Sequence, residues 1–136
     1  MTRTMENCFV FPSKQELSRF PVGSVVCVIA GGNYSTVVTV DGVEHLLLLQ
    51  LGQVEQRIKP FIERGDQFAL IGKSLLINCD FLSYIDVSRQ KLILSDCRTF
   101  SRELSASKKA LTDLKGKVEK KEGVEQKEDV EQKESQ

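Results

Sequence analysis

Tryptophan is absent from this sequence, histidine occurs once, at His45, and the four cysteines, at positions 8, 27, 79 and 97, form no C-x-x-C pair. This set fits neither a zinc site nor a disulfide framework, so we expect no metal, no cofactor, and reduced thiols in a cytosolic or nuclear protein. No apolar run approaches the roughly 20 residues that cross a bilayer, and residues 1–12 are too short and too interrupted for a secretory signal. The 136 residues allow one domain.

A surplus of either charge is also absent, because 19 basic and 19 acidic side chains cancel. Residues 1–115 hold 14 basic and 12 acidic groups, and residues 116–136 hold five lysines against seven acids. Free-standing nucleic-acid binders rely on an excess of lysine and arginine to displace counterions from phosphates. The balance therefore argues against a protein that binds nucleic acid by itself.

The last residues repeat with a period of six, with a valine at positions 118, 124 and 130 followed each time by charged or amide side chains. A period of six rotates the valines around a helix instead of aligning them in a stripe. One small apolar residue in six cannot offset the entropy lost when the backbone is ordered. Residues 119–136 are therefore predicted to be a disordered, charged, hexapeptide-repeat tail.

Most of the remaining chain has the pattern of β-strands. Residues 24–30 (SVVCVIA) are predicted to be a buried strand, and residues 35–40 and 43–51 flank Asp41-Gly42, a type I′ hairpin signal. Residues 67–71, a long strand over 74–87 and a returning strand over 91–100 complete the set.

Three segments have helical signals. Residues 52–64 place apolar side chains on one face but contain Pro60, which limits the helix to one or two turns. Residues 101–118 carry a leucine stripe behind Ser101 as a possible N-cap, and Ser13 to Glu16 have capping-box spacing that favours a short helix.

Three strands, a short helical link, two strands and a helix follow the element order of the OB barrel. We therefore expect a mainly β protein, a five-stranded OB-fold barrel with a C-terminal amphipathic helix and a disordered tail. The expected units are an N-terminal extension packed on the barrel (1–20), the barrel (21–100), the helix (101–118) and the tail (119–136).

Residues 20–28 (FPVGSVVCV), the hairpin with Val40-Asp-Gly42, and residues 64–73 (RGDQFALIGK) together resemble small OB subunits of single-stranded-DNA complexes. The resemblance is to the smallest subunit of the telomere-capping CST complex (the Ten-one type), which is related to the small subunit of replication protein A. It implies nuclear, telomeric localisation, larger OB-fold subunits as partners, and weak, shared binding of single-stranded DNA.

A second resemblance leads elsewhere. Residues 84–92 (YIDVSRQKL) look like the last hairpin of the RNA-binding OB subtype typified by ribosomal protein S-one and translation initiation factor two alpha. That alternative implies a cytoplasmic, translation-linked RNA binder or a decoy of the initiation factor. A third alternative is an OB-fold interaction module that binds no nucleic acid.

Catalytic signals are sparse. His45 lies in a predicted strand among leucines, and Gly72-Lys73-Ser74 resembles the end of a Walker motif but lacks the glycine required five positions before Gly72, where Gln67 stands. Asp80 and Asp86 are about 20 Å apart by strand rise, too far for paired acid–base work. We expect no enzyme.

Binding candidates are basic side chains that can follow a phosphate backbone and aromatic side chains that can stack on bases. The nucleic-acid candidates are Tyr34, Arg57, Lys59, Phe68, Lys73, Tyr84, Arg89, Lys91 and Arg98. Because the charge surplus of the core is small, we expect an accessory subunit that acts mainly through protein partners, with no membrane and no small-molecule substrate. The candidate partner-binding residues are Leu104, Leu111, Leu114 and Val118, which can also cap the barrel itself.

Overall fold

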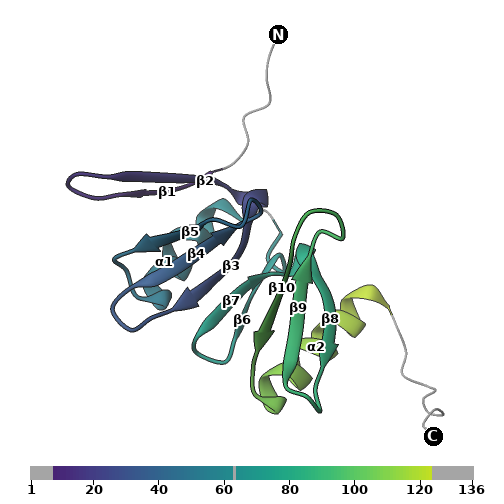
Figure 1. Cartoon of the computed structure of the whole chain (residues 1–136). Coiled ribbons are helices and arrows are strands. Elements are labelled where there is room, and N and C mark those ends of the chain that lie inside the picture. The colour runs from purple at the N-terminus through teal and green to yellow at the C-terminus, as the bar shows by residue number, and fades with distance from the viewer. Residues whose placement is uncertain (1–7, 63, 124–136) are drawn as a thin grey trace, which may run out of the picture.

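The computed structural model describes residues 8–62 and 64–123, which form ten strands in three antiparallel sheets and two α-helices (Figure 1). The strands are a hairpin of β1 (Cys8–Pro12) and β2 (Leu17–Pro21); a five-stranded sheet in the order β5 (Glu44–Leu47), β4 (Ser35–Thr39), β3 (Val25–Ala30), β7 (Leu75–Asn78), β6 (Phe68–Ile71); and a three-stranded sheet in the order β10 (Ser101–Ser105), β9 (Lys91–Ser95), β8 (Leu82–Asp86). The helices are α1 (Leu51–Ile58) and α2 (Lys108–Glu122), with short 3-10 turns η1 (Val22–Ser24), η2 (Lys59–Phe61) and η3 (Cys79–Phe81).

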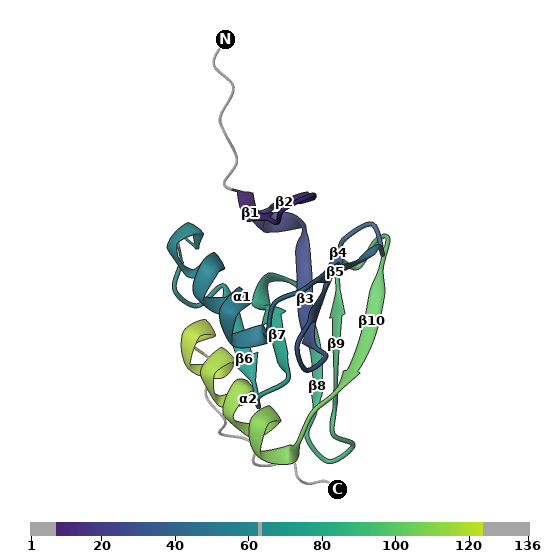
Figure 2. The ribbon, with the colours of Figure 1, turned by 90° about the vertical axis from the view of Figure 1, so that its left-hand side faces the viewer.

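The five-stranded sheet is the middle layer, and its two faces are covered differently (Figure 2). One core joins Val28 and Val37 of this sheet to the β1–β2 hairpin and α1. The other joins Cys27 and Ile77 to the three-stranded sheet and α2. This architecture confirms a mainly β fold. The five-stranded OB barrel was wrong, because over the described residues the sheets stay separate and β5 and β6 are open edges of the middle sheet.

The expected hairpin over residues 35–51 is confirmed, since β4 pairs with β5. The turn is not type I′, because Gly42 has a φ of 85° while Asp41 does not have a positive φ. The Gly42 N–H donates to the carbonyl of Thr39 at 2.8 Å, and the Thr39 N–H donates to the carbonyl of Val43 at 3.1 Å. A single left-handed glycine is enough for a longer hairpin loop of this kind.

The predicted strand over 74–87 is divided between two sheets. Its first part is β7, in which all four residues are buried, and its last part is β8 in the three-stranded sheet. Asn78, the last residue of β7, is fully buried; its side chain donates to the carbonyl of Val25 and accepts from the Asp80 N–H, and the turn η3 follows. This turn moves the chain from one sheet to the other, and period-two alternation could not indicate it.

Of the two outer helix predictions, the C-terminal one began too early and the N-terminal one was wrong. Residues 101–105 pair with β9 as β10, and α2 starts behind Ser107, whose Oγ accepts from the Ala110 N–H at 3.1 Å. Ser13 and Glu16 form the β1–β2 turn instead of a helix, with the Glu16 N–H donating to Ser13 Oγ. The short helix limited by Pro60 is confirmed, because α1 ends at Ile58 and η2 follows. The predicted tail over 119–136 began too early, because residues 119–122 are the last turn of α2 and Gly123 caps the helix. The rest of that prediction, residues 124–136, lies outside the described residues.

Candidate nucleic-acid interface

Four connections gather at one end of the molecule, the lower end in Figures 1 and 2. They are the β3–β4 loop (31–34), the β6–β7 turn (72–74), the β8–β9 turn with the first residue of β9 (87–91), and the link into α2 with the first two residues of that helix (106–109). The antiparallel register brings them together: the Ala30 N–H donates to the Ser74 carbonyl at 2.9 Å, and the Ala106 N–H donates to the Gln90 carbonyl at 3.2 Å. We name these sixteen residues the loop face.

The loop face is basic, although the chain as a whole is neutral. It holds Lys73, Arg89, Lys91, Lys108 and Lys109 and no acidic residue. Asp86, the last residue of β8, borders it and pairs with Lys91 across the strands. The connections at the opposite end of the strands (22–24, 40–43, 64–67, 79–81 and 96–100) hold four acids and two bases. The charges are therefore separated along the strand axis, which the total of zero conceals.

Four of the five basic groups of the loop face are available to a ligand, whereas Lys91 is 26% exposed and lies 3.8 Å from Glu103. Lys73 and Lys108 are exposed, and neither has an acidic group within 4 Å in the part of the chain that the structure describes. Arg89 lies 3.7 Å from Asp86, and the Lys109 ammonium lies 3.2 Å from Asp113, with both cations largely exposed. Exposed pairs of this kind are weak and screened by salt, so a phosphate can compete for the cation.

Tyr34 is held in a fixed position on the loop face. The Gly31 N–H donates to its carbonyl at 2.8 Å, and the exposed ring lies against the Gly31 backbone, where a Cβ would be 2.7 Å from Cζ of the ring. Gly32 has a φ of 82°, which allows the tight turn. The neighbouring Asn33 side chain accepts from Gln50 Nε2 at 3.3 Å. The loop thus presents one aromatic ring and one amide to solvent.

The β8–β9 turn is organised by Asp86. Its Oδ1 accepts from the Ser88 hydroxyl and from the Arg89 N–H, and its Oδ2 accepts from the Tyr84 hydroxyl at 3.2 Å. The hydrogen bond from Ser88, followed by that from the Arg89 N–H, lowers the pKa of Asp86 from its usual value. Gln90 has a φ of 58°, which reverses the chain. Arg89 is consequently presented from a fixed turn, while the Tyr84 ring remains about half exposed.

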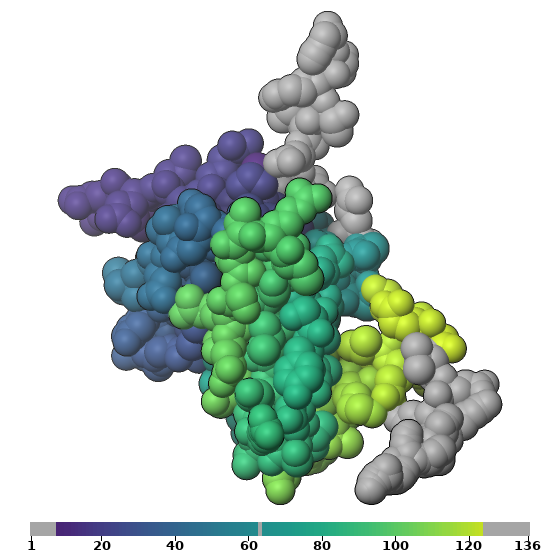
Figure 3. All heavy atoms as spheres, turned by 45° about the vertical axis from the view of Figure 1, so that its right-hand side comes forward, coloured from purple at the N-terminus to yellow at the C-terminus, as the bar shows by residue number. Residues whose placement is uncertain are grey.

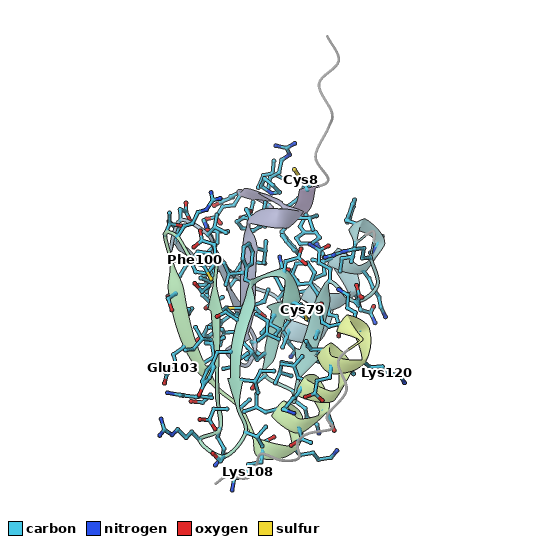
Figure 4. The ribbon with its side chains drawn as sticks, turned by 90° about the vertical axis from the view of Figure 1, so that its right-hand side faces the viewer. Cys8, Cys79, Phe100, Glu103, Lys108 and Lys120 are labelled. Atoms are coloured by element: carbon cyan, nitrogen blue, oxygen red, sulfur yellow. The ribbon has the colours of Figure 1, made fainter. Side chains whose placement is uncertain are left out.

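The sequence-predicted nucleic-acid residues are divided among several places. Tyr34, Lys73, Arg89 and Lys91 lie on the loop face, and Tyr84 lies on the strand that leads to it. The other candidates lie away from it. Arg57 of α1 lines a small groove between the β1–β2 hairpin and residues 46–49, and Lys59 is in η2. Phe68 packs edge-to-face with Phe9 at 5.8 Å, and Arg98 is in the β9–β10 loop. Figure 4 shows that loop, marked by Phe100, well above Lys108 at the lower end.

Lys108 and Lys109 were missed by the sequence analysis. The signal was present, since Ser107 precedes two lysines and an apolar stripe and is a good N-cap. Placing the cap at Ser101 put both lysines in the middle of a helix and hid the strand–helix boundary.

The predicted partner-binding leucines are used within the chain. Leu111 and Leu114 are 0% and 3% exposed and belong to the core beneath the three-stranded sheet. Leu104 lies in β10 and, like Val118 of α2, is partly buried against the same core. The stripe therefore covers the chain's own sheet.

His45 belongs to a small polar cluster with Thr39 and Asp41. The Thr39 hydroxyl donates to Asp41 Oδ1 at 2.6 Å and lies 3.1 Å from His45 Nε2. The hydrogen bond from the Thr39 hydroxyl lowers the pKa of Asp41. The Asp41 carboxylate also accepts from the Val43 N–H, so the cluster closes the β4–β5 turn. Burial raises the pKa of the Cys27 thiol to about 11, which makes it a poor nucleophile at neutral pH.

Two further features bear on what the described residues can do. Among residues 8–62 and 64–123, no group of three or more histidine, cysteine, aspartate or glutamate side chains is placed to hold a metal ion. In the same part of the chain, neither helix is long and apolar enough to cross a membrane.

Comparison with known proteins shows a likeness in fold. The structure matches a LytTr DNA-binding domain of a methyl-accepting/DNA response regulator from Bacillus cereus, with a TM-score of 0.59 and 11% sequence identity. The match covers 84% of this chain and 98% of that one. No protein-family model matches the sequence, and no curated protein does.

This finding overturns the resemblance to the CST subunit. The chain has the fold of a LytTr DNA-binding domain instead of that of an OB subunit, so the assignment to a telomere or replication complex was wrong. The translation-type and interaction-module alternatives assumed the same OB barrel and fall with it. The misleading segments were short glycine and valine motifs that occur at the turns of many β proteins.

Proposed function

We propose that this chain is a DNA-binding module of a bacterial type and that it contacts duplex DNA with its loop face. Two observations support the proposal: the fold matches nearly the whole of a LytTr DNA-binding domain, and the loop face gathers five basic and no acidic side chains. The second observation carries the proposal, because phosphate contacts supply most of the sequence-independent affinity for DNA.

The position of Lys108 and Lys109 favours a polyanionic ligand. They occupy the first turn of α2, which contains no acidic residue. The positive end of the helix dipole disfavours cations there, by about 0.3–1 kcal/mol for a typical charge. A phosphate at this end would interact favourably with the lysines and with the helix N-terminus together, which offsets the local penalty.

Sequence readout needs groups that can reach base edges in a groove. The β3–β4 loop supplies them in Asn33 and Tyr34, and the strand order places this loop between the end of β5 and the β6–β7 turn that carries Lys73. In this arrangement, the lysines and Arg89 fix the register on the phosphates while Asn33 and Tyr34 discriminate between base pairs.

Salt dependence of binding tests the proposal. The full chain would be titrated into a labelled duplex of random sequence and into its separated strand, over a series of salt concentrations, with fluorescence anisotropy as the readout. Phosphate contacts from the four exposed basic groups predict a slope of log K against log salt of about −3 to −4 on the duplex. A K73Q/K108Q variant is expected to reduce that slope by about 2.

Arg98→Gln is the matched control, because Arg98 is exposed at the opposite end of the strands. It should leave the slope unchanged. Equal slopes for the wild type and the K73Q/K108Q variant, or tighter binding to the single strand than to the duplex, would contradict the proposal.

A further inference from the structure

A hollow of about 460 Å³ lies between the C-terminal half of α2 and the edge strand β6, away from the loop face. Figure 3 shows the surface hollowed beside the last turns of α2. Apolar side chains and charged side chains both line it. The apolar ones are Phe68, Leu70, Cys79, Leu82, Leu114 and Val118, and the charged ones are Glu55, Asp66, Lys117, Lys121 and Glu122. The volume falls within the range of small-molecule sites, roughly 300–1,000 Å³.

The hollow exists because α2 and the edge of the middle sheet meet only in part. β6 is the last strand of its sheet, so no further strand covers its outer edge, and Leu70 on it is 43% exposed. Leu114, one helix turn before Val118, is 3% exposed and closes the floor. Apolar side chains thus line an open space that the chain's own core does not fill.

The two lysines at the rim differ in whether an acidic side chain already pairs with them. The Lys121 ammonium lies 3.3 Å from Asp66, so these two charges satisfy each other. Lys117 lines the same hollow, and in the described part of the chain it has no acidic group within 4 Å. Both ammonium groups act electrostatically on the Cys79 thiol, although burial is the larger effect and raises the pKa of that thiol.

We propose that this hollow binds a small amphipathic molecule with an apolar body and a single carboxylate, whose head group pairs with Lys117. The apolar body would cover Leu70, Leu82 and Val118. Glu55 and Glu122 also line the hollow and disfavour a ligand with several negative charges, such as a nucleotide or DNA. A ligand with a long apolar body and one negative charge can contact the apolar floor and also pair with Lys117.

Three probes of equal chain length test the head group: decanoate, decanol and decylamine, each used below its micelle concentration with the full chain. The readout is the alkylation rate of Cys79 by iodoacetamide, followed by mass spectrometry, because Cys79 lies inside the hollow. Figure 4 places Cys79 between the strands and α2. Cys97 is exposed in the β9–β10 loop and serves as the internal control. Decanoate should slow alkylation of Cys79 and leave Cys97 unchanged.

Two pairs of variants test separately the ion pair with the head group and the apolar contact with the floor of the hollow. K117Q should weaken protection by decanoate up to about fivefold, as expected for one exposed ion pair. K120Q should not, because Lys120 points away from the hollow (Figure 4). L70Q removes an exposed part of the floor, and L48Q removes a leucine that is 81% exposed at a distant edge, so only L70Q should weaken binding.

The pattern of Cys79 protection supports or overturns the proposal. Protection by decanoate that depends on Lys117 and Leu70 supports it. Protection by decanol or decylamine that equals or exceeds that by decanoate overturns the carboxylate assignment. Absence of protection by all three, or equal slowing at Cys97, overturns the site, and so does a dimer whose interface closes the hollow.

Discussion

The side-chain amide of Asn78 donates a hydrogen bond of 2.9 Å to the main-chain carbonyl of Val25, which lies 53 residues earlier in the sequence. The same side chain accepts from the Asp80 N–H at 3.0 Å. One buried amide therefore ties the start of β3 to the point where the chain leaves the middle sheet for the three-stranded sheet. The layered arrangement depends on this connection.

Replacing Asn78 with alanine should lower the free energy of unfolding by about 2–3 kcal/mol. The substitution leaves the buried Val25 carbonyl without its donor and opens a small cavity in the core. Urea denaturation followed by circular dichroism measures the change. Asn33→Ala is the control, since Asn33 is exposed and its loss should change stability by less than about 0.5 kcal/mol. Similar losses for the two variants would show that the amide is not a structural tie.

The Tyr34 ring should be displaced by a single methyl group. Gly31→Ala places a Cβ within 2.7 Å of the ring, so the ring must move, and duplex binding should weaken if the ring contacts DNA. In a Tyr34→Ala background the same substitution meets no ring and should have little further effect. The double-mutant cycle, measured by anisotropy, isolates the coupling of the two residues. Additive effects of the two changes would mean that the ring position does not matter for binding.

Asp96 should make the stability of the β9–β10 loop sensitive to acid. Its carboxylate accepts from the Thr99 hydroxyl and from the N–H groups of Arg98, Thr99 and Phe100, and these bonds hold its pKa well below the usual value of 3.8. A carboxyl whose pKa is depressed by folding stabilises the native state above its unfolded pKa, and this contribution is lost as pH falls below about 4.

Asp96→Asn should therefore lower the urea midpoint at pH 7 and flatten its decline below pH 4. Asp113→Asn, on the exposed face of α2, is the control and should change the midpoint much less. If the wild type and Asp96→Asn decline in parallel below pH 4, another carboxylate carries the acid sensitivity.

Ser107 and Ser101 give a direct comparison between the structure and the sequence pattern. Ser107→Ala should destabilise the chain by about 1 kcal/mol because the first turn of α2 loses its N-cap. Ser101→Ala should have a smaller effect, since Ser101 is an exposed residue of β10. A larger loss at Ser101 would place the helix start where the sequence pattern placed it.

The sequence was informative where local rules decide the structure. The β4–β5 hairpin follows from Asp41-Gly42, and the end of α1 follows from Pro60, because a turn glycine and a proline act on their immediate neighbours. The break at Asn78 could not be foreseen, since it depends on a partner 53 residues away. The predicted OB barrel was wrong for the same reason, because the pattern of residues 74–87 does not show that the chain changes sheets there.

Some residues of the candidate interface could be predicted from the sequence, but their grouping on one face could not. Tyr34, Lys73, Arg89 and Lys91 stand out as polar or aromatic residues near turns, but Phe68 has the same appearance and packs against Phe9 in the core. Which loops share an end of the molecule depends on strand order and register. The separation of charge between the two ends was therefore hidden in a total of zero.

Replacing Lys108 with glutamate should raise the stability of the chain and weaken its binding to duplex DNA. Lys108→Glu puts an acid in the first turn of α2, where the helix dipole favours it, so the free energy of unfolding should rise by about 0.5–1 kcal/mol. The same change places a negative charge on the loop face and should weaken duplex binding while flattening its salt dependence. Lys120→Glu is the matched control, because Lys120 is in the last turn of the same helix. It should lower stability and leave duplex binding unchanged. If Lys108→Glu raises stability without any loss of affinity, the lysines of the first turn do not contact DNA, and the loop face must be reassigned.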